Sequence, residues 1–145
     1  MSFLSLINFS SRIYLPLGRI TIFVIYFWFG FLKILGLSPA GPLVEELLNK
    51  TLPFVAFSDF ILLFGVYETI IGLVFLFPKL DRVSIWLFFA HMVMAALPLF
   101  VLPGATWQQF LVPTLEGQYI IKNLGLVAIV FGIIASLKRR PVPKS

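Results

Sequence analysis

Four long apolar stretches, separated by short polar segments, dominate the chain. They run from about residue 13 to 35, 56 to 77, 83 to 102 and 118 to 137, and each is long enough for an α-helix to cross a bilayer. Because backbone groups in lipid must be paired within their own segment, such stretches predict helices. The pattern therefore predicts an all-α protein, a bundle of four transmembrane helices.

The polar segment between the first and second stretches predicts one further helix. Residues 42–51 combine apolar pairs four apart with charged positions. Glu45 and Glu46 stand early in this segment and Lys50 stands late, which suits the helix dipole. We expect a short amphipathic helix that lies in the membrane interface.

The composition agrees with a single membrane domain over residues 1–145. Hydrophobic residues make up 60% of the chain, charged residues only 12%, and the mean hydropathy is +1.04. The net charge of +5 does not indicate nucleic acid as a partner, because the basic residues lie at the ends of apolar stretches. The absence of cysteine excludes thiolate metal sites and dithiol relays.

Most of the basic residues gather at one set of helix ends. Of the eleven in the chain, these are Arg12, Arg19, Lys79, Arg82, Lys138, Arg139, Arg140 and Lys144. The positive-inside rule assigns such ends to the cytoplasm. Both termini are therefore predicted to be cytoplasmic.

One acidic residue, Glu68, stands near the middle of the second apolar stretch. Gly65 and Gly72 lie three and four residues from it, so the three share one helical face. Glycines on a transmembrane helix let another backbone approach closely, and we assign Gly65 and Gly72 to helix packing. The Glu68 carboxylate is therefore expected to point into protein, where it needs a partner or a proton.

Estimated depth groups Glu68 with two other polar residues. At about 1.5 Å per residue, Arg19, Glu68 and His91 fall at similar depths from the cytoplasmic ends of their helices. We predict that they form an intramembrane cluster. Two interpretations stay open: an ion pair that fixes helix register, or a site that binds a ligand or exchanges protons. For His91 a hydrogen-bonded packing role is the simpler alternative.

A second polar group is predicted near the outer face. Its members are two bases and two acids: Lys33, Asp59, Glu116 and Lys122. In one interpretation the lysines extend to the headgroups and the acids are surface partners. In the other, the group forms an electropositive pocket for an anion or the polar head of a quinone.

Several chemistries are excluded by the residues available. A haem held by two histidines needs a second histidine, and a Ser-His-Asp set cannot be assembled convincingly around His91 alone. No metal site, P-loop or dinucleotide-binding glycine pattern is found. If electrons pass through this protein, their carrier is diffusible or borrowed, and a quinone is the one candidate cofactor.

Four features together resemble the DoxX-like superfamily of small membrane proteins. They are Arg19, the run WFGFLK over residues 28–33, the run GVYETIIG over residues 65–72 and the run LEGQYIIKNL over residues 115–124. The resemblance extends from about residue 19 to 137. It implies a four-helix bundle in the bacterial inner membrane. Matched by position, the family's polar residues are Arg19, Lys33, Glu68 and Lys122.

The resemblance leaves two classes of function open. Some relatives are small subunits of thiosulfate:quinone oxidoreductase or of other membrane-bound oxidoreductases, and others assist the maturation of partner proteins. In the first hypothesis this chain is an oxidoreductase-associated subunit that binds a quinone, with Glu68 exchanging protons, and a cavity should reach Glu68. In the alternative it is a non-enzymatic accessory or scaffold that docks a partner membrane protein, and its core should be filled. The lipid bilayer is a partner in both hypotheses, and a second copy of the chain is a further candidate.

Overall fold

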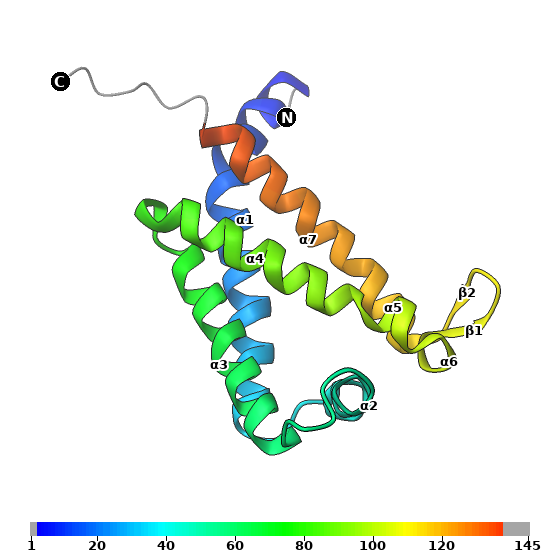
Figure 1. The fold of residues 1–145 in the computed structure, drawn as a ribbon. Coiled ribbons are helices and arrows are strands. Elements are labelled where there is room, and N and C mark those ends of the chain that lie inside the picture. The colour runs from blue at the N-terminus through cyan, green and yellow to red at the C-terminus, as the bar shows by residue number, and fades with distance from the viewer. Residues whose placement is uncertain (1–2, 138–145) are drawn as a thin grey trace.

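The computed structural model describes residues 3–137, and most of them are helical (Figure 1). In this part of the chain four helical segments are long and apolar enough to cross a membrane, which confirms the four predicted helices and is typical of a multi-pass membrane protein. The segments are Arg12–Ile34, Phe57–Phe75, Pro78–Val101 and Leu115–Leu137. The first lies within α1 (Phe3–Ile34), the second is α3 (Phe57–Phe75) and the fourth is α7 (Leu115–Leu137).

The third membrane segment is interrupted near its end. It consists of η1 (Pro78–Leu80), α4 (Asp81–Ala96) and α5 (Pro98–Val101). The break falls at Pro98, because proline has no backbone N–H to continue the helical ladder.

Several helices begin outside the apolar stretches. α1 begins at Phe3, about ten residues before the predicted start, and α7 begins at Leu115 instead of residue 118. Hydropathy reports the part of a helix that suits hydrocarbon, whereas the helix itself continues wherever its backbone hydrogen bonds do. The side chain of Thr114 accepts a hydrogen bond from the N–H of Gly117 at 3.1 Å, which caps the start of α7.

The helices run alternately up and down between two ends of the bundle. Figure 1 shows the start of α1, the end of α3, the start of α4 and the end of α7 at one end, here called the terminal end. The opposite end, here called the hairpin end, carries α2 (Gly41–Thr51). α2 occupies the position predicted for the amphipathic helix and buries Leu48. Lys50 Nζ on α2 donates to the Val101 carbonyl of α5 at 2.9 Å.

The all-α prediction omitted a small hairpin that joins α5 to α7. After α6 (Pro103–Thr106), β1 (Trp107–Gln109) pairs antiparallel with β2 (Val112–Pro113). Leu111 in the turn has a φ of 58°, in the left-handed region that bulky residues rarely adopt. Two strands this short have no hydropathy signature of their own, so their pairing depends on the turn and on anchoring to neighbouring helices.

α1 and α3 make the closest helix pair in the bundle, and glycines explain why. A methyl group added at Gly30 of α1 would lie 2.6 Å from the carbonyl oxygen of Gly65 on α3. One added at Gly72 would lie 2.8 Å from the backbone nitrogen of Phe27. Only residues without a Cβ allow this approach, so glycine sets both the spacing and the register of the two helices.

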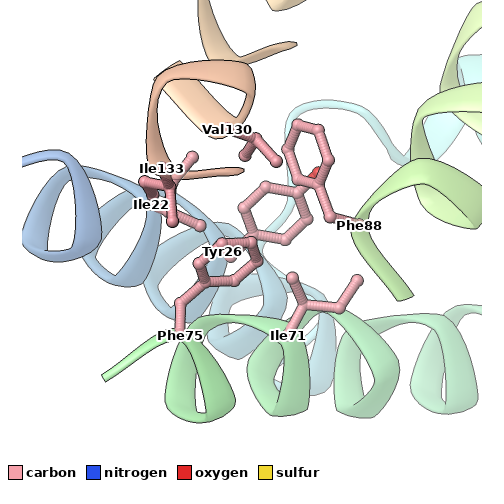
Figure 2. Packing of buried hydrophobic residues seen from close by; sticks show 7 residues of the cluster. All are labelled: Ile22, Tyr26, Ile71, Phe75, Phe88, Val130 and Ile133. Atoms are coloured by element: carbon pink, nitrogen blue, oxygen red, sulfur yellow. The ribbon is translucent and has the colours of Figure 1, made fainter. Parts of the chain in front are cut away.

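Apolar side chains from all four membrane segments meet near the middle of the bundle. Figure 2 shows this cluster of Ile22, Tyr26, Ile71, Phe75, Phe88, Val130 and Ile133. Phe75 and Phe88 are fully buried and contact each other edge to face, with ring centroids 6.0 Å apart. Tyr26 connects this apolar core to the polar residues described next.

Candidate functional site

A row of four hydrogen-bonded polar side chains lies buried among three helices. Glu68 of α3 is central: its Oε2 lies 2.6 Å from Nζ of Lys33, and its Oε1 lies 2.9 Å from Nε2 of His91. The row continues from Nδ1 of His91 to the hydroxyl of Tyr26, 3.0 Å away. Each of the four residues is no more than 6% exposed. We call Lys33, Glu68, His91 and Tyr26 the tetrad.

The close packing of α1 on α3 positions two members of the tetrad. Tyr26 and Lys33 lie seven residues apart, which places them on one face of α1 with Gly30 between them. A methyl group added at Gly65 would lie 2.9 Å from Cβ of Lys33, so Gly65 makes room for the lysine stem beside α3. The lysine can therefore reach Glu68, one turn further along α3, without leaving the interior.

Aromatic rings enclose the charged part of the tetrad. The Phe64 ring stacks on the His91 imidazole with centroids 5.3 Å apart, and Lys33 Nζ lies 5.5 Å from the Phe64 centroid. Tyr67 stands beside His91 and donates to the carbonyl of Leu87 at 2.7 Å. These rings give the charged groups apolar surroundings. In such surroundings an unpaired charge costs much free energy, whereas the attraction within an ion pair is stronger than in water.

One assignment of protons that satisfies every contact of the tetrad starts from Glu68. A Glu68 carboxylate accepts from the Lys33 ammonium and from an N–H at Nε2 of His91. The neutral imidazole then has a free lone pair at Nδ1, which accepts from the hydroxyl of Tyr26. In this arrangement the positive and negative charges cancel, and both oxygens of Glu68 and both nitrogens of His91 have partners.

Arg19 belongs to a second, separate site nearer the terminal end. Its Nη1 lies 2.6 Å from Oδ1 of Asp81 and donates to the carbonyl of Phe75 at 3.0 Å. Phe75 ends α3 and Asp81 begins α4, so one guanidinium on α1 joins three helices and satisfies an unpaired carbonyl at a helix end. The contact with Asp81 is at ion-pair distance without hydrogen-bonding geometry, and Nε and Nη2 of Arg19 are buried without hydrogen bonds.

The predicted cluster of Arg19, Glu68 and His91 is therefore brought together only in part. Glu68 and His91 are in contact, whereas Arg19 pairs with Asp81. The depth estimate counted residues from the ends of apolar stretches, but the glycine register between α1 and α3 decides which residues face each other. That register sets Glu68 opposite the part of α1 that contains Lys33, about four turns beyond Arg19.

The predicted outer group of four residues does not assemble. Lys33 is buried in the tetrad, while Asp59, Glu116 and Lys122 are exposed. Within residues 3–137 no ion pair joins these three side chains, and Lys122 instead lies over the ring of Tyr119 at 4.4 Å. Lys33 differs because a long side chain near a helix end turns inward when a buried carboxylate offers a partner.

Two residues of these sites were not predicted from the sequence. Tyr26 could have been found, because it lies two turns from Lys33 on the same face of α1. Asp81 had no such signal, since it stands between Lys79 and Arg82 in a segment that reads as a charged turn. Only the fold reveals that Asp81 turns inward and Lys79 does not.

The described residues include no group of three or more histidine and acidic side chains that could hold a metal. A quinone carbonyl accepts hydrogen bonds, and the donors of the tetrad are Lys33, His91 and Tyr26. A contact within the tetrad already joins His91 to Tyr26 and to Glu68, so a quinone bound at either ring would displace one of these contacts. Lys33 Nζ uses one of its three N–H groups on Glu68. Comparison of the chain with protein-family models, with curated protein sequences and with solved structures finds no match.

Proposed function

We propose that this chain is a DoxX-like inner-membrane subunit that accompanies an oxidoreductase and contributes docking and positioning, with no reaction of its own. The observation that carries the positioning role is the matching of the tetrad: Glu68 has a partner at each oxygen, and His91 has one at each ring nitrogen. The association with an oxidoreductase is proposed from the sequence resemblance. A site built to receive a substrate usually keeps groups free for it, whereas a matched buried network fixes one arrangement of helices.

The surface available for a partner follows from this packing. The glycine face of α3 is already covered by α1, so it is not free for another protein. α2 remains available at the hairpin end, with Glu45 and Glu46 exposed and Leu48 buried against the bundle. We propose that α2 lies in the membrane interface and offers this acidic side to the partner.

The proposed orientation places both termini in the cytoplasm. Among the described residues, the exposed charges near the terminal end are Arg12, Lys79 and Arg82, all basic. The hairpin end carries two exposed bases, Lys50 and Lys122, together with the exposed acids of the described chain, Glu45, Glu46, Asp59 and Glu116. The positive-inside rule then favours the terminal end as the cytoplasmic side of a bacterial inner membrane.

A second candidate function is quinone binding with proton exchange at Glu68. It is favoured by the position of His91, which touches Tyr26 through one ring nitrogen and Glu68 through the other. An imidazole so placed can take a proton on one side and release one on the other. A quinone that displaced Tyr26 or Lys33 would then exchange protons with this row of groups.

One purification experiment separates the two candidates. The wild-type protein and Glu68→Gln are isolated from native membranes in mild detergent, with Glu116→Gln as a control for an exposed carboxylate, and every quinone and polypeptide retained is identified by mass spectrometry. A stoichiometric redox protein retained by wild type and the control, with no quinone on the chain, supports the docking role. A quinone held by wild type and lost from correctly folded Glu68→Gln supports the second candidate and overturns the first. Retention of neither a partner nor a quinone by wild type counts against both.

A further inference from the structure

A shallow groove follows one side of α4 at the terminal end of the bundle. Its volume is about 530 Å³, and it is lined by Arg82, Val83, Trp86, Leu87 and Ala90. The four apolar residues are spaced 0, 3, 4 and 7 along the helix, so they form one continuous face. The tetrad and the Arg19 site contribute no side chain to it.

The groove has one charged end and an apolar remainder. Arg82 is the second residue of α4, and Trp86 follows about 6 Å further along the helix. Trp86 is 71% exposed and Val83 is 52% exposed, so neither is covered by the rest of the chain. In a helix that spans a membrane, Arg82 then lies at headgroup level and Trp86 at the boundary with the acyl chains.

The buried pairing of Asp81 makes the charge around this groove one-sided. Asp81 precedes Arg82 in the chain but is turned inward and neutralised by Arg19. The nearest other exposed charge in sequence is Lys79, which lines a separate shallow groove of about 420 Å³ formed by residues 77–80. No exposed acid of the described chain therefore lies beside Arg82 in sequence to compete for its charge.

We propose that this groove binds a phospholipid with an anionic headgroup. Arg82 contacts the phosphate, Lys79 adds to the positive field, and the face formed by Val83, Trp86, Leu87 and Ala90 contacts an acyl chain. Basic sites at the cytoplasmic ends of membrane helices recognise anionic lipids in this way. A zwitterionic lipid fits the apolar face equally well but gains less from the two cations. This inference uses none of the tetrad residues, and it shares with the proposed function only the assignment of the terminal end to the cytoplasmic side.

Quenching of Trp86 by brominated lipid tests the proposal directly. The full chain carrying Trp28→Phe and Trp107→Phe retains Trp86 as its one tryptophan. It is reconstituted in phosphatidylcholine vesicles that contain equal fractions of either brominated phosphatidylglycerol or brominated phosphatidylcholine. One basic side chain near the surface attracts an anionic lipid by about 1 kcal/mol. We therefore expect phosphatidylglycerol to bind beside Trp86 about fivefold more tightly than phosphatidylcholine. Arg82→Gln should remove most of this preference, because only the weaker field of Lys79 then remains.

Arg12→Gln is the matched control, because it removes the same charge at the same end without altering the groove. The preference should persist in this variant. Equal quenching by the two lipids in the parent protein overturns the proposal. An equal loss of preference in Arg12→Gln and Arg82→Gln also overturns it, since the general positive charge of this end would then explain the lipid preference. If the single-tryptophan protein does not fold, native mass spectrometry of wild type, Arg82→Gln and Arg12→Gln counts retained phosphatidylglycerol instead, with loss expected only in Arg82→Gln.

Discussion

Lys33 Nζ lies 2.6 Å from Glu68 Oε2, so two residues 35 positions apart in the chain form one buried ion pair. The side chains are 6% and 7% exposed, which leaves the pair almost entirely removed from solvent and lipid. Burying either charge alone costs several kcal/mol, and the mutual attraction offsets that cost only while both are present. The pair therefore commits α1 and α3 to one relative position.

Removal of the Glu68 charge should destabilise the protein strongly. Glu68→Gln leaves the Lys33 ammonium buried without a counter-charge, and we expect a loss of about 3 kcal/mol in the free energy of unfolding. Unfolding by sodium dodecyl sulfate in mixed micelles, followed by circular dichroism, measures this change. Glu116→Gln, at an exposed site, should change the same free energy by less than about 0.5 kcal/mol. Equal stability of the two variants would show that the Lys33 pair is not energetically important.

Removing the charges of Lys33 and Glu68 together should lower the free energy of unfolding by less than the sum of the two single effects. Lys33→Met replaces the lysine by an apolar side chain of similar length, and combined with Glu68→Gln it leaves no unpaired charge while the glutamine can still accept from His91. We expect the double variant to be at least about 1 kcal/mol more stable than the sum of the single effects predicts. The measurement is a double-mutant cycle under the same unfolding conditions. Simple additivity would contradict a direct ion pair.

Arg19 and Glu68 should behave as independent sites. Arg19 forms an ion pair with Asp81, and Glu68 forms one with Lys33, so the two sites share no partner. The effects of Arg19→Gln and Glu68→Gln on stability should therefore add to within about 0.5 kcal/mol. The same mutant cycle with Asp81→Asn in place of Glu68→Gln is the comparison, and it should show clear coupling with Arg19. Strong coupling between Arg19 and Glu68 would instead favour the arrangement predicted from depth alone.

The glycine contact between α1 and α3 should tolerate no side chain. Gly30→Ala places a methyl group 2.6 Å from the Gly65 carbonyl, so the helices must separate, and we expect a loss of about 1–3 kcal/mol. Gly125→Ala on α7 is the control, because nothing lies within 4 Å of the added methyl group. That change should leave stability unchanged or raise it by up to about 1 kcal/mol through helix propensity. A destabilised control with an unaffected Gly30→Ala would refute the close approach.

The candidate site was predictable where the signal lay within one helix. Glu68 with Gly65 and Gly72 shares a face because residues three and four apart always do in an α-helix. The contact of Glu68 with His91 also agrees with the depth estimate, since both residues lie near the middle of their helices. The sequence instead places Lys33 in the outer group, because a lysine near a helix end usually extends to the headgroups or lines an outer pocket.

By itself, the sequence determined that the chain has four helices long and apolar enough to cross a membrane and that an acid lies in the second of them. Both follow from local rules: the thickness of the hydrocarbon layer sets helix length, and unpaired backbone groups are not tolerated there. Only the tertiary structure decided which base meets which acid, giving Lys33 to Glu68 and Arg19 to Asp81. The reason is that partner choice depends on the rotation and register of neighbouring helices, which are set by contacts such as that between Gly30 and Gly65 and have no signature in either helix alone.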